Sequence, residues 1–294
     1  MKRLLAVLLL GAAVAAGAQP AGPAAAYGER AEVKRFIRDM VERHGFVESE
    51  LVTLFSRLYR VEPVLTAIAT PAEITRWSDY RPIFVNPKRI EAGLVFWKTH
   101  QRTLARAEKR YGVPAEIIVA IIGVETSYGR NPGRWRVVEA LATLAFDYPP
   151  RGTFFRSELE HYLLLARDAD VDVFSVRGSY AGAIGIPQFM PSSLRRYAVD
   201  FDRDGRIDLS RNNADAIGSV ANFLKQHGWR SGQPLQRKEG EADAGAGERL
   251  IDLGSEKRVG LANFQALLRY NRSPLYAAAV ADLSEALAAQ RAGR

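Results

Sequence analysis

Cysteine is absent from the 294 residues of this chain. The fold therefore contains no disulfide bond, and no thiol is available as a nucleophile, a metal ligand or a point of lipid attachment. Histidine is scarce as well. Its four positions, 44, 100, 161 and 227, do not have the spacing of a zinc motif such as H-E-x-x-H. These absences argue against thiol chemistry and zinc chemistry.

Other common catalytic and binding signatures are also missing. Ser179 lies in GSYAG, which is not a G-x-S-x-G nucleophile elbow, and no phosphate-binding or dinucleotide-binding glycine pattern occurs. The net charge of +8 favours an anionic polymer as the partner. Arg and Lys are scattered among acidic residues, however, and no DNA- or RNA-binding motif is present. We therefore expect no nucleic-acid partner.

The first residues have the three parts of a secretory signal peptide. Lys2 and Arg3 precede an apolar stretch from Leu4 to Val14, and small residues follow up to Ala18. An uncleaved membrane anchor is the weaker alternative, because the apolar stretch is shorter than the about 20 residues of a spanning helix. We predict a signal peptide over residues 1–18, cleaved on export, and a linker of small residues over 19–28.

Apolar residues recur every three or four positions through most of the remaining chain, which is typical of amphipathic helices. The pattern predicts one long helix over residues 86–112. A helix that is apolar on nearly every side opens at Pro114 and leads into AIIGVETSYG, residues 120–129. Residues 229–261 differ, because they are polar and rich in glycine, and only RLIDL has the character of a strand. The fold class is therefore mainly α with a small β insert.

Glu125 is the carboxylate in the least usual setting, at the end of that apolar helix. Burial beside isoleucine side chains disfavours the charged form, so its pKa should be raised and it could donate a proton near neutral pH. A structural carboxylate that bonds a neighbouring helix remains the alternative.

A second informative stretch is GSYAGAIGIPQFMPSS, residues 178–193. Its glycines allow close approach of the backbone to a ligand, although an ordinary loop explains them as well. Ser179, Tyr180 and Gln188 share the stretch, and their side chains suit the hydroxyl and amide groups of sugars.

The sequence DFDRDGRID, residues 200–208, predicts a calcium site. Aspartates stand at positions 1, 3, 5 and 9 of an EF-hand-like loop, with glycine at position 6 and a backbone carbonyl offered at position 7. Arg211 replaces the usual glutamate at position 12, so we expect a later acid to complete the site. The predicted ligands are Asp200, Asp202, Asp204, Arg206, Asp208 and Asp215. An aspartate-rich turn without metal is the alternative.

Taken in order, GVETSYG, GSYAGAIGIPQFMPSS, the aspartate loop with DAIGSVANFLKQHGW, and RYNRSPLY resemble the membrane-bound lytic murein transglycosylase B family. The resemblance runs from about Phe36 to the C-terminus. It implies a lysozyme-like core with an added helical domain, and cleavage of peptidoglycan strands between N-acetylmuramic acid and N-acetylglucosamine. It also implies that Glu125 is the single acid and base and that the product carries a 1,6-anhydro ring. No cofactor is needed for this chemistry, and calcium would be structural.

The resemblance further implies a set of substrate-binding residues and a domain plan. The binding residues would be Tyr80, Arg151, Ser179, Tyr180, Gln188, Phe189, Tyr270, Asn271 and Tyr276. The plan has a helical domain over 29–95 completed by a C-terminal helix over 277–294, a catalytic core over 96–228 with the loop at 200–215, a β insert over 229–261, and a return to the core over 262–276.

Three departures from the family pattern matter. No cysteine follows the signal, so we expect a periplasmic protein without a lipid anchor. The polar insert is short, so the β domain of the family should be reduced. Phe223 stands where a tyrosine is expected, which keeps a ring and loses a hydroxyl.

Two other functions compete with this one. A hydrolytic muramidase would need a second carboxylate opposite Glu125, for which Asp147 and Glu158 are the candidates. A non-catalytic peptidoglycan-binding protein would have no use for an acid in an apolar helix. The expected partner is the glycan strand, bound by a monomer, and proteins of wall synthesis remain open as further partners.

Overall fold

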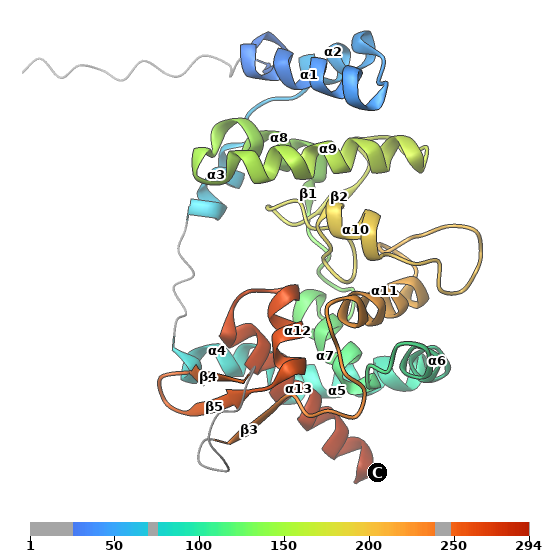
Figure 1. Ribbon diagram of the computed structural model, residues 1–294, viewed down its shortest axis with the longest axis vertical. Helices are drawn as coiled ribbons and strands as arrows, with labels where there is room; N and C mark the ends of the chain where they lie inside the picture. The colour runs from blue at the N-terminus through green and yellow to red at the C-terminus, as the bar shows by residue number, and fades with distance from the viewer. Residues whose placement is uncertain (1–25, 70–75, 239–247, 294) are drawn as a thin grey trace, which may run out of the picture.

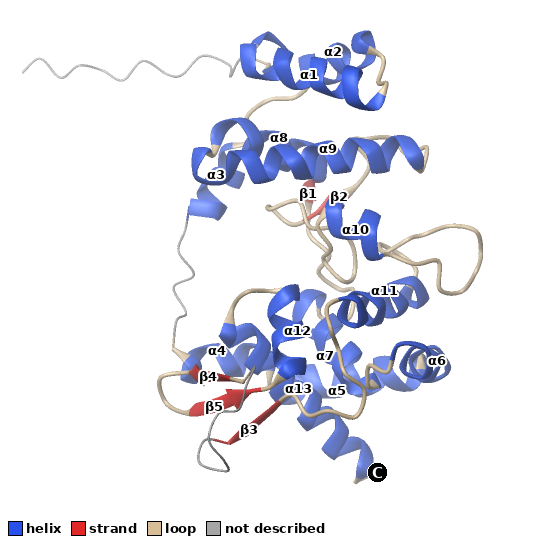
Figure 2. Cartoon of the chain, viewed as in Figure 1, coloured by secondary structure: helices blue, strands red, loops and turns tan. Residues whose placement is uncertain are grey.

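The computed structural model describes residues 26–69, 76–238 and 248–293. The predicted signal peptide over 1–18 and all but the last three residues of the linker lie outside these ranges. The described chain forms two lobes, one above the other, with loops between them (Figure 1). Helices make up most of both lobes and strands are few and short (Figure 2). The predicted fold class, mainly α with a small β element, is confirmed.

The upper lobe combines the first helices of the chain with two from its middle. Its elements are η1 (Tyr27–Glu29), α1 (Ala31–His44), α2 (Glu48–Ser56), α3 (Glu62–Ala69), α8 (Val137–Asp147), η2 (Pro149–Arg151) and α9 (Gly152–Asp168). Phe36, Phe55 and Phe146 meet edge to face, with ring centroids 5.8 to 6.2 Å apart. These rings join α1 and α2 to the end of α8 in one hydrophobic cluster.

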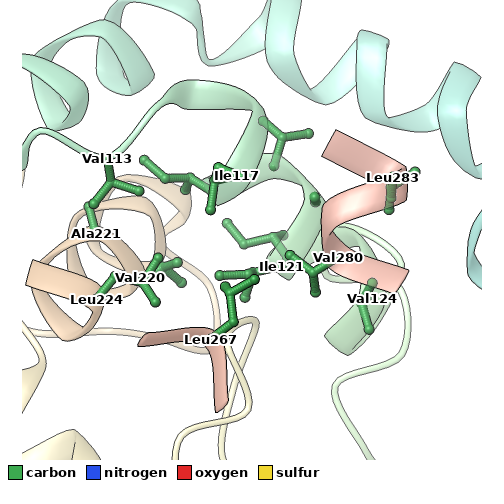
Figure 3. Close-up of a cluster of buried hydrophobic side chains, with 14 of the residues drawn as sticks. Val113, Ile117, Ile121, Val124, Val220, Ala221, Leu224, Leu267, Val280 and Leu283 are labelled. Atoms are coloured by element: carbon green, nitrogen blue, oxygen red, sulfur yellow. The ribbon is translucent and has the colours of Figure 1, made fainter. Parts of the chain in front are cut away.

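The lower lobe is built around one buried helix. Its helices are α4 (Trp77–Phe84), α5 (Pro87–Thr99), α6 (Gln101–Tyr111), α7 (Ala115–Thr126), α11 (Asn213–Gln226), α12 (Ala262–Tyr270) and α13 (Pro274–Ala292). Ile117 and Ile121 of α7 pack against Val220 and Leu224 of α11 on one side and Val280 of α13 on another (Figure 3). Since α7 is covered on nearly every side, a helix with no polar face is stable there.

Three short segments lie between the two lobes: β1 (Trp135–Arg136), β2 (Arg177–Gly178) and α10 (Pro191–Tyr197). The strands β1 and β2 pair antiparallel. A second sheet, of β3 (Gln236–Lys238), β5 (Lys257–Gly260) and β4 (Arg249–Asp252) in that order, falls within the predicted insert at 229–261. Sequence pattern indicated only β4.

The two hydrophobic clusters divide the chain differently from the predicted domain boundaries. Helices α1 to α3 pack with α8 and α9, which were assigned to the core, whereas α4, α5 and α13 pack with α7. The predicted helical domain of 29–95 with 277–294 is thus split between the lobes. Periodicity identifies a buried face, but it does not identify the helix that covers it.

The helix predicted over 86–112 is also interrupted. At His100 the backbone leaves the helical region, with φ −108° and ψ 21°, and α5 ends where α6 begins. The His100 N–H still donates to the Phe96 carbonyl, and the His100 carbonyl accepts the Leu104 N–H, so both backbone groups of His100 are paired at the break. The bend lets α5 pack on α13 while α6 packs on α11. No helix in the described ranges has the length and apolar character required to cross a membrane.

Candidate active site

Glu125 lies in the last turn of α7, and its side chain is partly buried. The Tyr276 hydroxyl donates a hydrogen bond to Oε1 of Glu125 over 2.7 Å. Burial raises the pKa of Glu125 to about 7, and the hydrogen bond from Tyr276 acts in the opposite direction. The carboxyl is therefore close to half protonated near neutral pH, which is the condition for a group that first donates and later accepts a proton.

Tyrosines from three helices surround this carboxyl. The rings of Tyr270 and Tyr276 lie nearly parallel, with centroids 6.4 Å apart and planes 13° apart. The charge of Glu125 also contributes to raising the pKa of Tyr80, after burial. Three of the aromatic residues predicted for the site, from α4, α12 and α13, are thus brought around Glu125.

The carboxyl end of α7 is fixed by contacts that the sequence did not reveal. The Thr126 hydroxyl donates to the Ile186 carbonyl over 2.8 Å and accepts the Gly129 N–H over 2.9 Å. It therefore ties the helix end to the stretch at 178–193. A buried threonine after a glutamate has no sequence signature of its own, since its bonds join residues far apart in the chain.

Tyr128 makes further contacts that fix the carboxyl end of α7. Its hydroxyl donates to the Arg89 carbonyl over 2.9 Å, and the Arg89 guanidinium donates to the Gly123 carbonyl. A Cβ on Gly123 would come within 2.6 Å of the Tyr128 hydroxyl, and one on Gly93 within 2.4 Å. The two glycines are the only sequence signal for this packing, because they leave room for the ring.

The stretch 178–193 folds back on itself beside α7. The Ile184 and Phe189 backbones exchange hydrogen bonds of 2.8 and 3.1 Å, and the Ser179 hydroxyl accepts the Ala183 N–H. Gln188 has a positive φ of 51°, which is uncommon without glycine, and its amide donates to the carbonyls of Pro132 and Gly185. Ser179 and Gln188 therefore shape the loop through their side chains.

Phe189 and Phe223 add two rings to the aromatic residues around Glu125, because both lie against Tyr270. Phe189 is buried and its ring lies 5.7 Å from Tyr270 and 5.5 Å from Phe223. Phe223 in turn stacks on His227, with centroids 4.0 Å apart. The Tyr270 hydroxyl donates to the Pro187 carbonyl over 2.6 Å, which fixes the ring against the loop.

Within the part of the chain that the structure describes, three of the predicted binding residues make no hydrogen bond or ring contact with the aromatic residues around Glu125. Tyr180 is exposed, Asn271 accepts the Ser273 N–H next to α13, and Arg151 lies over the rings of Phe154 and Phe155. Their assignment to the site rests on the resemblance alone.

Both candidates for a second catalytic carboxylate have other partners. Asp147 accepts hydrogen bonds from the Tyr27 hydroxyl and the Arg30 guanidinium in the upper lobe. Glu158 is buried and accepts the N–H and the hydroxyl of Ser192 at the start of α10. Each carboxylate is therefore held by structural hydrogen bonds.

The aspartate loop has the form of a cation site. Asp200, Asp202 and Asp204 can each place one carboxylate oxygen within 4.8 Å of the others. The Asp200 carboxylate accepts the N–H groups of Asp204 and Gly205, which curls the chain around it, and Gly205 takes a φ of 89° at the sharp turn. These oxygen donors fit calcium, which prefers hard ligands of this kind.

Asp208 and Asp215, which were predicted as metal ligands, both accept hydrogen bonds from backbone N–H groups. Asp208 Oδ1 accepts the N–H groups of Ser210 and Arg211. Asp215 is fully buried, and its two oxygens accept the Phe201 N–H over 2.7 Å and the Asp208 N–H over 2.9 Å. Asp215 therefore closes the loop from the inside, and its role as a metal ligand stays a prediction.

Comparison with known proteins identifies the family. The model of the transglycosylase SLT domain matches residues 28–246. Membrane-bound lytic murein transglycosylase B of Escherichia coli K12 is 38% identical, in an alignment covering 90% of this chain and 85% of that protein. The crystal structure of the soluble lytic transglycosylase SltB1 from Pseudomonas aeruginosa is similar with a TM-score of 0.81 at 46% identity, over 89% of this chain and 99% of the other.

Two further similar structures contain ligands. The Escherichia coli lytic transglycosylase Slt35 in complex with calcium has a TM-score of 0.80 at 38% identity, over 90% of this chain and 95% of the other. SltB3 from Pseudomonas aeruginosa, in complex with NAG-anhNAM-pentapeptide, has a TM-score of 0.77 at 29% identity, over 87% and 79%. The lysozyme-like fold expected from the resemblance is confirmed by these matches, and this chain belongs to the SLT-domain family of lytic transglycosylases.

Proposed function

We propose that the protein is a peptidoglycan lytic transglycosylase that cleaves the bond between N-acetylmuramic acid and N-acetylglucosamine and leaves a 1,6-anhydro product. The observation that carries the proposal is the partly buried carboxyl of Glu125, with a pKa of about 7 and a hydrogen bond from Tyr276. The similarity to SltB3, which was crystallised with NAG-anhNAM-pentapeptide, supports the nature of the product.

Glu125 acts first as an acid and then as a base. In its protonated form it gives a proton to the glycosidic oxygen as the bond from C1 of the muramic residue breaks. The C6 hydroxyl oxygen of the same residue then bonds to C1, and its proton passes to the Glu125 carboxylate. The residue regains its starting state, and no water is consumed.

A hydrolytic muramidase is the weaker candidate. It would need a second carboxylate to activate water or to act as a nucleophile. Asp147 and Glu158, the two acids considered for this role, are engaged by Tyr27, Arg30 and Ser192. A binding protein without turnover does not explain an acid with a raised pKa at the end of α7.

The glycan would lie against the aromatic residues around Glu125. We assign Tyr80, Phe189, Tyr270 and Tyr276 to apolar contacts with the faces of the sugars. Ser179, Tyr180, Gln188, Asn271 and Arg151 would supply polar contacts, as the family resemblance implies. The same resemblance supports export to the periplasm, where the substrate is found. We expect no cysteine-linked lipid, because the sequence contains no cysteine.

Mass spectrometry of the muropeptides released from purified peptidoglycan tests the reaction. The protein and its Glu125→Gln variant are compared on the same substrate. Products one water lighter than reducing-end muropeptides, absent with the variant, are expected. Reducing ends would establish hydrolysis instead, and binding without product would favour the binding protein.

Calcium is proposed as a structural ion at the aspartate loop. Asp200, Asp202 and Asp204 would hold it, and the similarity to Slt35, solved in complex with calcium, supports the identity of the ion. The ion would neutralise three carboxylates that otherwise repel one another. It would hold the loop between α10 and α11 and take no part in the chemistry.

A further inference from the structure

The backbone makes a strained turn almost directly after Glu125. Ser127, Tyr128 and Gly129 have φ values of 53°, 64° and 81°, so three successive residues lie in the left-handed region. Glycine adopts this region freely, whereas two successive residues with side chains in it are uncommon. Such a conformation persists only where the surrounding structure holds it.

The end of α7 accounts for only part of this turn. A helix commonly ends with a single left-handed residue, usually glycine. The Ser127 N–H donates to the Gly123 carbonyl over 3.1 Å. The Tyr128 N–H donates to the Ile122 carbonyl over 3.3 Å, and these two bonds complete the helix end. The second left-handed residue, Tyr128, is therefore explained by the place that its side chain takes.

The side chain of Tyr128 lies between α5 and α7. Its hydroxyl donates to the Arg89 carbonyl of α5 over 2.9 Å, and its ring centroid lies 5.6 Å from that of Phe96 on the same helix. Gly93 of α5 and Gly123 of α7 leave the space that the ring occupies. The Arg89 guanidinium crosses in the opposite direction and donates to the Gly123 carbonyl. Two hydrogen bonds, here called the α5–α7 clamp, thus hold the last turn of α7 and the strained residues after it.

The charge of Arg89 suits its place in the clamp. A cation near the last carbonyls of a helix interacts favourably with the helix dipole. Arg89 is half-buried, and burial lowers its pKa, so the charge is placed there at a cost in free energy. The Gly123 carbonyl, which is near the end of α7, supplies the favourable contact.

We propose that Arg89 and Tyr128 are positioning residues for the transglycosylase reaction, because they hold the last turn of α7 and with it the carboxyl of Glu125. The proposal rests on the proposed function and adds to it two residues that act through α7. A general acid must lie within about 3 Å of the atom that it protonates. A displacement of about 1 Å can lower the rate about a hundredfold. Without the clamp the strained turn would relax, and Glu125 would leave its place beside Tyr276.

The test measures kcat and KM on soluble peptidoglycan strands for Arg89→Gln and Tyr128→Phe. Each variant removes one bond of the clamp and leaves the aromatic residues around Glu125 unchanged. The expected result is a kcat about ten- to a hundredfold lower, with KM within about twofold of the unaltered protein. Arg89→Lys keeps a cation and a donor and should recover most of the lost kcat. Tyr128→Phe decides the question if Arg89→Gln does not fold.

Matched controls lie in the upper lobe. The Arg167 guanidinium donates to the His44 carbonyl, at the end of α1, over 2.7 Å. The Tyr162 hydroxyl donates to the Val173 carbonyl over 2.6 Å. Arg167→Gln and Tyr162→Phe therefore remove the same two kinds of bond from the other lobe. With all variants assayed well below their measured melting temperatures, these two should keep the kcat of the unaltered protein.

Three results would overturn the proposal. An equal fall in kcat in the controls would mean that the loss follows stability alone. A higher KM with unchanged kcat would assign the clamp to substrate binding. Unchanged kcat and KM in Arg89→Gln and Tyr128→Phe would show that Glu125 keeps its position without the clamp. In all three the unaltered protein is active, which distinguishes them from failure of the proposed function, in which it releases no product.

Discussion

The hydroxyl of Tyr276 and the carboxylate of Glu125 are joined by a hydrogen bond of 2.7 Å, although 151 positions separate them in the sequence. The bond exists because α13, near the end of the chain, packs directly on α7. It favours the ionised carboxylate and thereby limits the rise in pKa that burial produces. The C-terminal helix therefore takes part in setting the protonation state of the proposed acid.

Replacing Tyr276 with phenylalanine should raise the pKa of Glu125 above about 7, since the bond that lowers it is lost. Activity that depends on the protonated acid falls as the pH rises through that pKa. The alkaline limb of the kcat/KM profile should therefore move to higher pH in Tyr276→Phe. Tyr270→Phe is the control, because that hydroxyl donates to the Pro187 carbonyl. An alkaline limb that stays in place in Tyr276→Phe would contradict the role of the bond.

Stability should depend on pH through the same group. The pKa of Glu125 is raised from 4.5 to about 7 on folding, so the unfolded chain loses this proton first as the pH rises. The stabilisation from the protonated form is complete below pH 4.5 and is lost as the pH rises through about 7. Glu125→Gln has no such loss. Between pH 4.5 and 8, the free energy of unfolding of the variant should therefore increase by up to about 3 kcal/mol relative to that of the unaltered protein.

Urea unfolding of both proteins at a series of pH values measures this difference. Glu160→Gln is a useful comparison, because hydrogen bonds from His44 and Arg43 outweigh burial and lower the pKa of Glu160. For Glu160→Gln the pH dependence should have the opposite sign: the free energy of unfolding of the unaltered protein should rise relative to that of the variant as the pH rises. A difference in the free energy of unfolding between Glu125→Gln and the unaltered protein that stays the same at every pH would show that the pKa of this carboxyl does not change on folding.

The sequence indicated the residues with local signatures and missed those whose role depends on distant partners. Glu125 stands out because one acid ends an apolar helix, and the aspartates of 200–208 because their spacing is regular. Thr126 and Tyr128 did not stand out, since their bonds reach Ile186 and Arg89. The site assignments beyond the residues with local signatures came from the family resemblance.

The domain plan shows the same limit. Helices α1 to α3 have clear apolar faces, but their covering helices, α8 and α9, follow about seventy residues later in the chain. Asp215 was predicted as a ligand from its position after the loop, and the two N–H groups that occupy it became visible only in three dimensions. Sequence spacing places an acid near a loop without giving the direction of its side chain.

Calcium should raise the melting temperature, and removal of calcium by a chelator should lower it. An ion that binds only the folded protein stabilises it by about 2.7 kcal/mol when its concentration is one hundred times Kd. Thermal unfolding with calcium and with chelator measures the shift. Magnesium at the same concentration is a control for ionic strength.

A double variant, Asp202→Asn with Asp204→Asn, should lose the calcium-dependent shift. It leaves Asp200, whose oxygens accept N–H groups of the loop, in place. Glu29→Gln with Glu32→Gln, in the upper lobe, removes the same charge and should keep the full shift. Equal melting of the unaltered protein with calcium and with chelator would contradict a bound ion.

Asp282 links the C-terminal helix to two other parts of the lower lobe. Its carboxylate accepts hydrogen bonds from Arg81 of α4 and Arg258 of β5, and its side chain is only 7% exposed. Asp282→Asn would remove the charge and leave Arg258, which is 14% exposed, with Glu256 as its remaining ion-pair partner. Breaking one side of a buried pair is strongly destabilising. We expect a loss of about 3 kcal/mol in the free energy of unfolding.

Glu62→Gln is the matched control for this prediction, because it breaks an ion pair with Arg60 in which both side chains are exposed. Exposed pairs contribute little, so that variant should lose less than about 1 kcal/mol. Asp282 also lies on the helix that carries Tyr276, so a shift of α13 in Asp282→Asn should weaken the hydrogen bond to Glu125. The alkaline limb of the activity profile would then move in the same direction as in Tyr276→Phe. Reduced stability with an unchanged limb would mean that Asp282 supports the β sheet and α4 without holding the tyrosine in place.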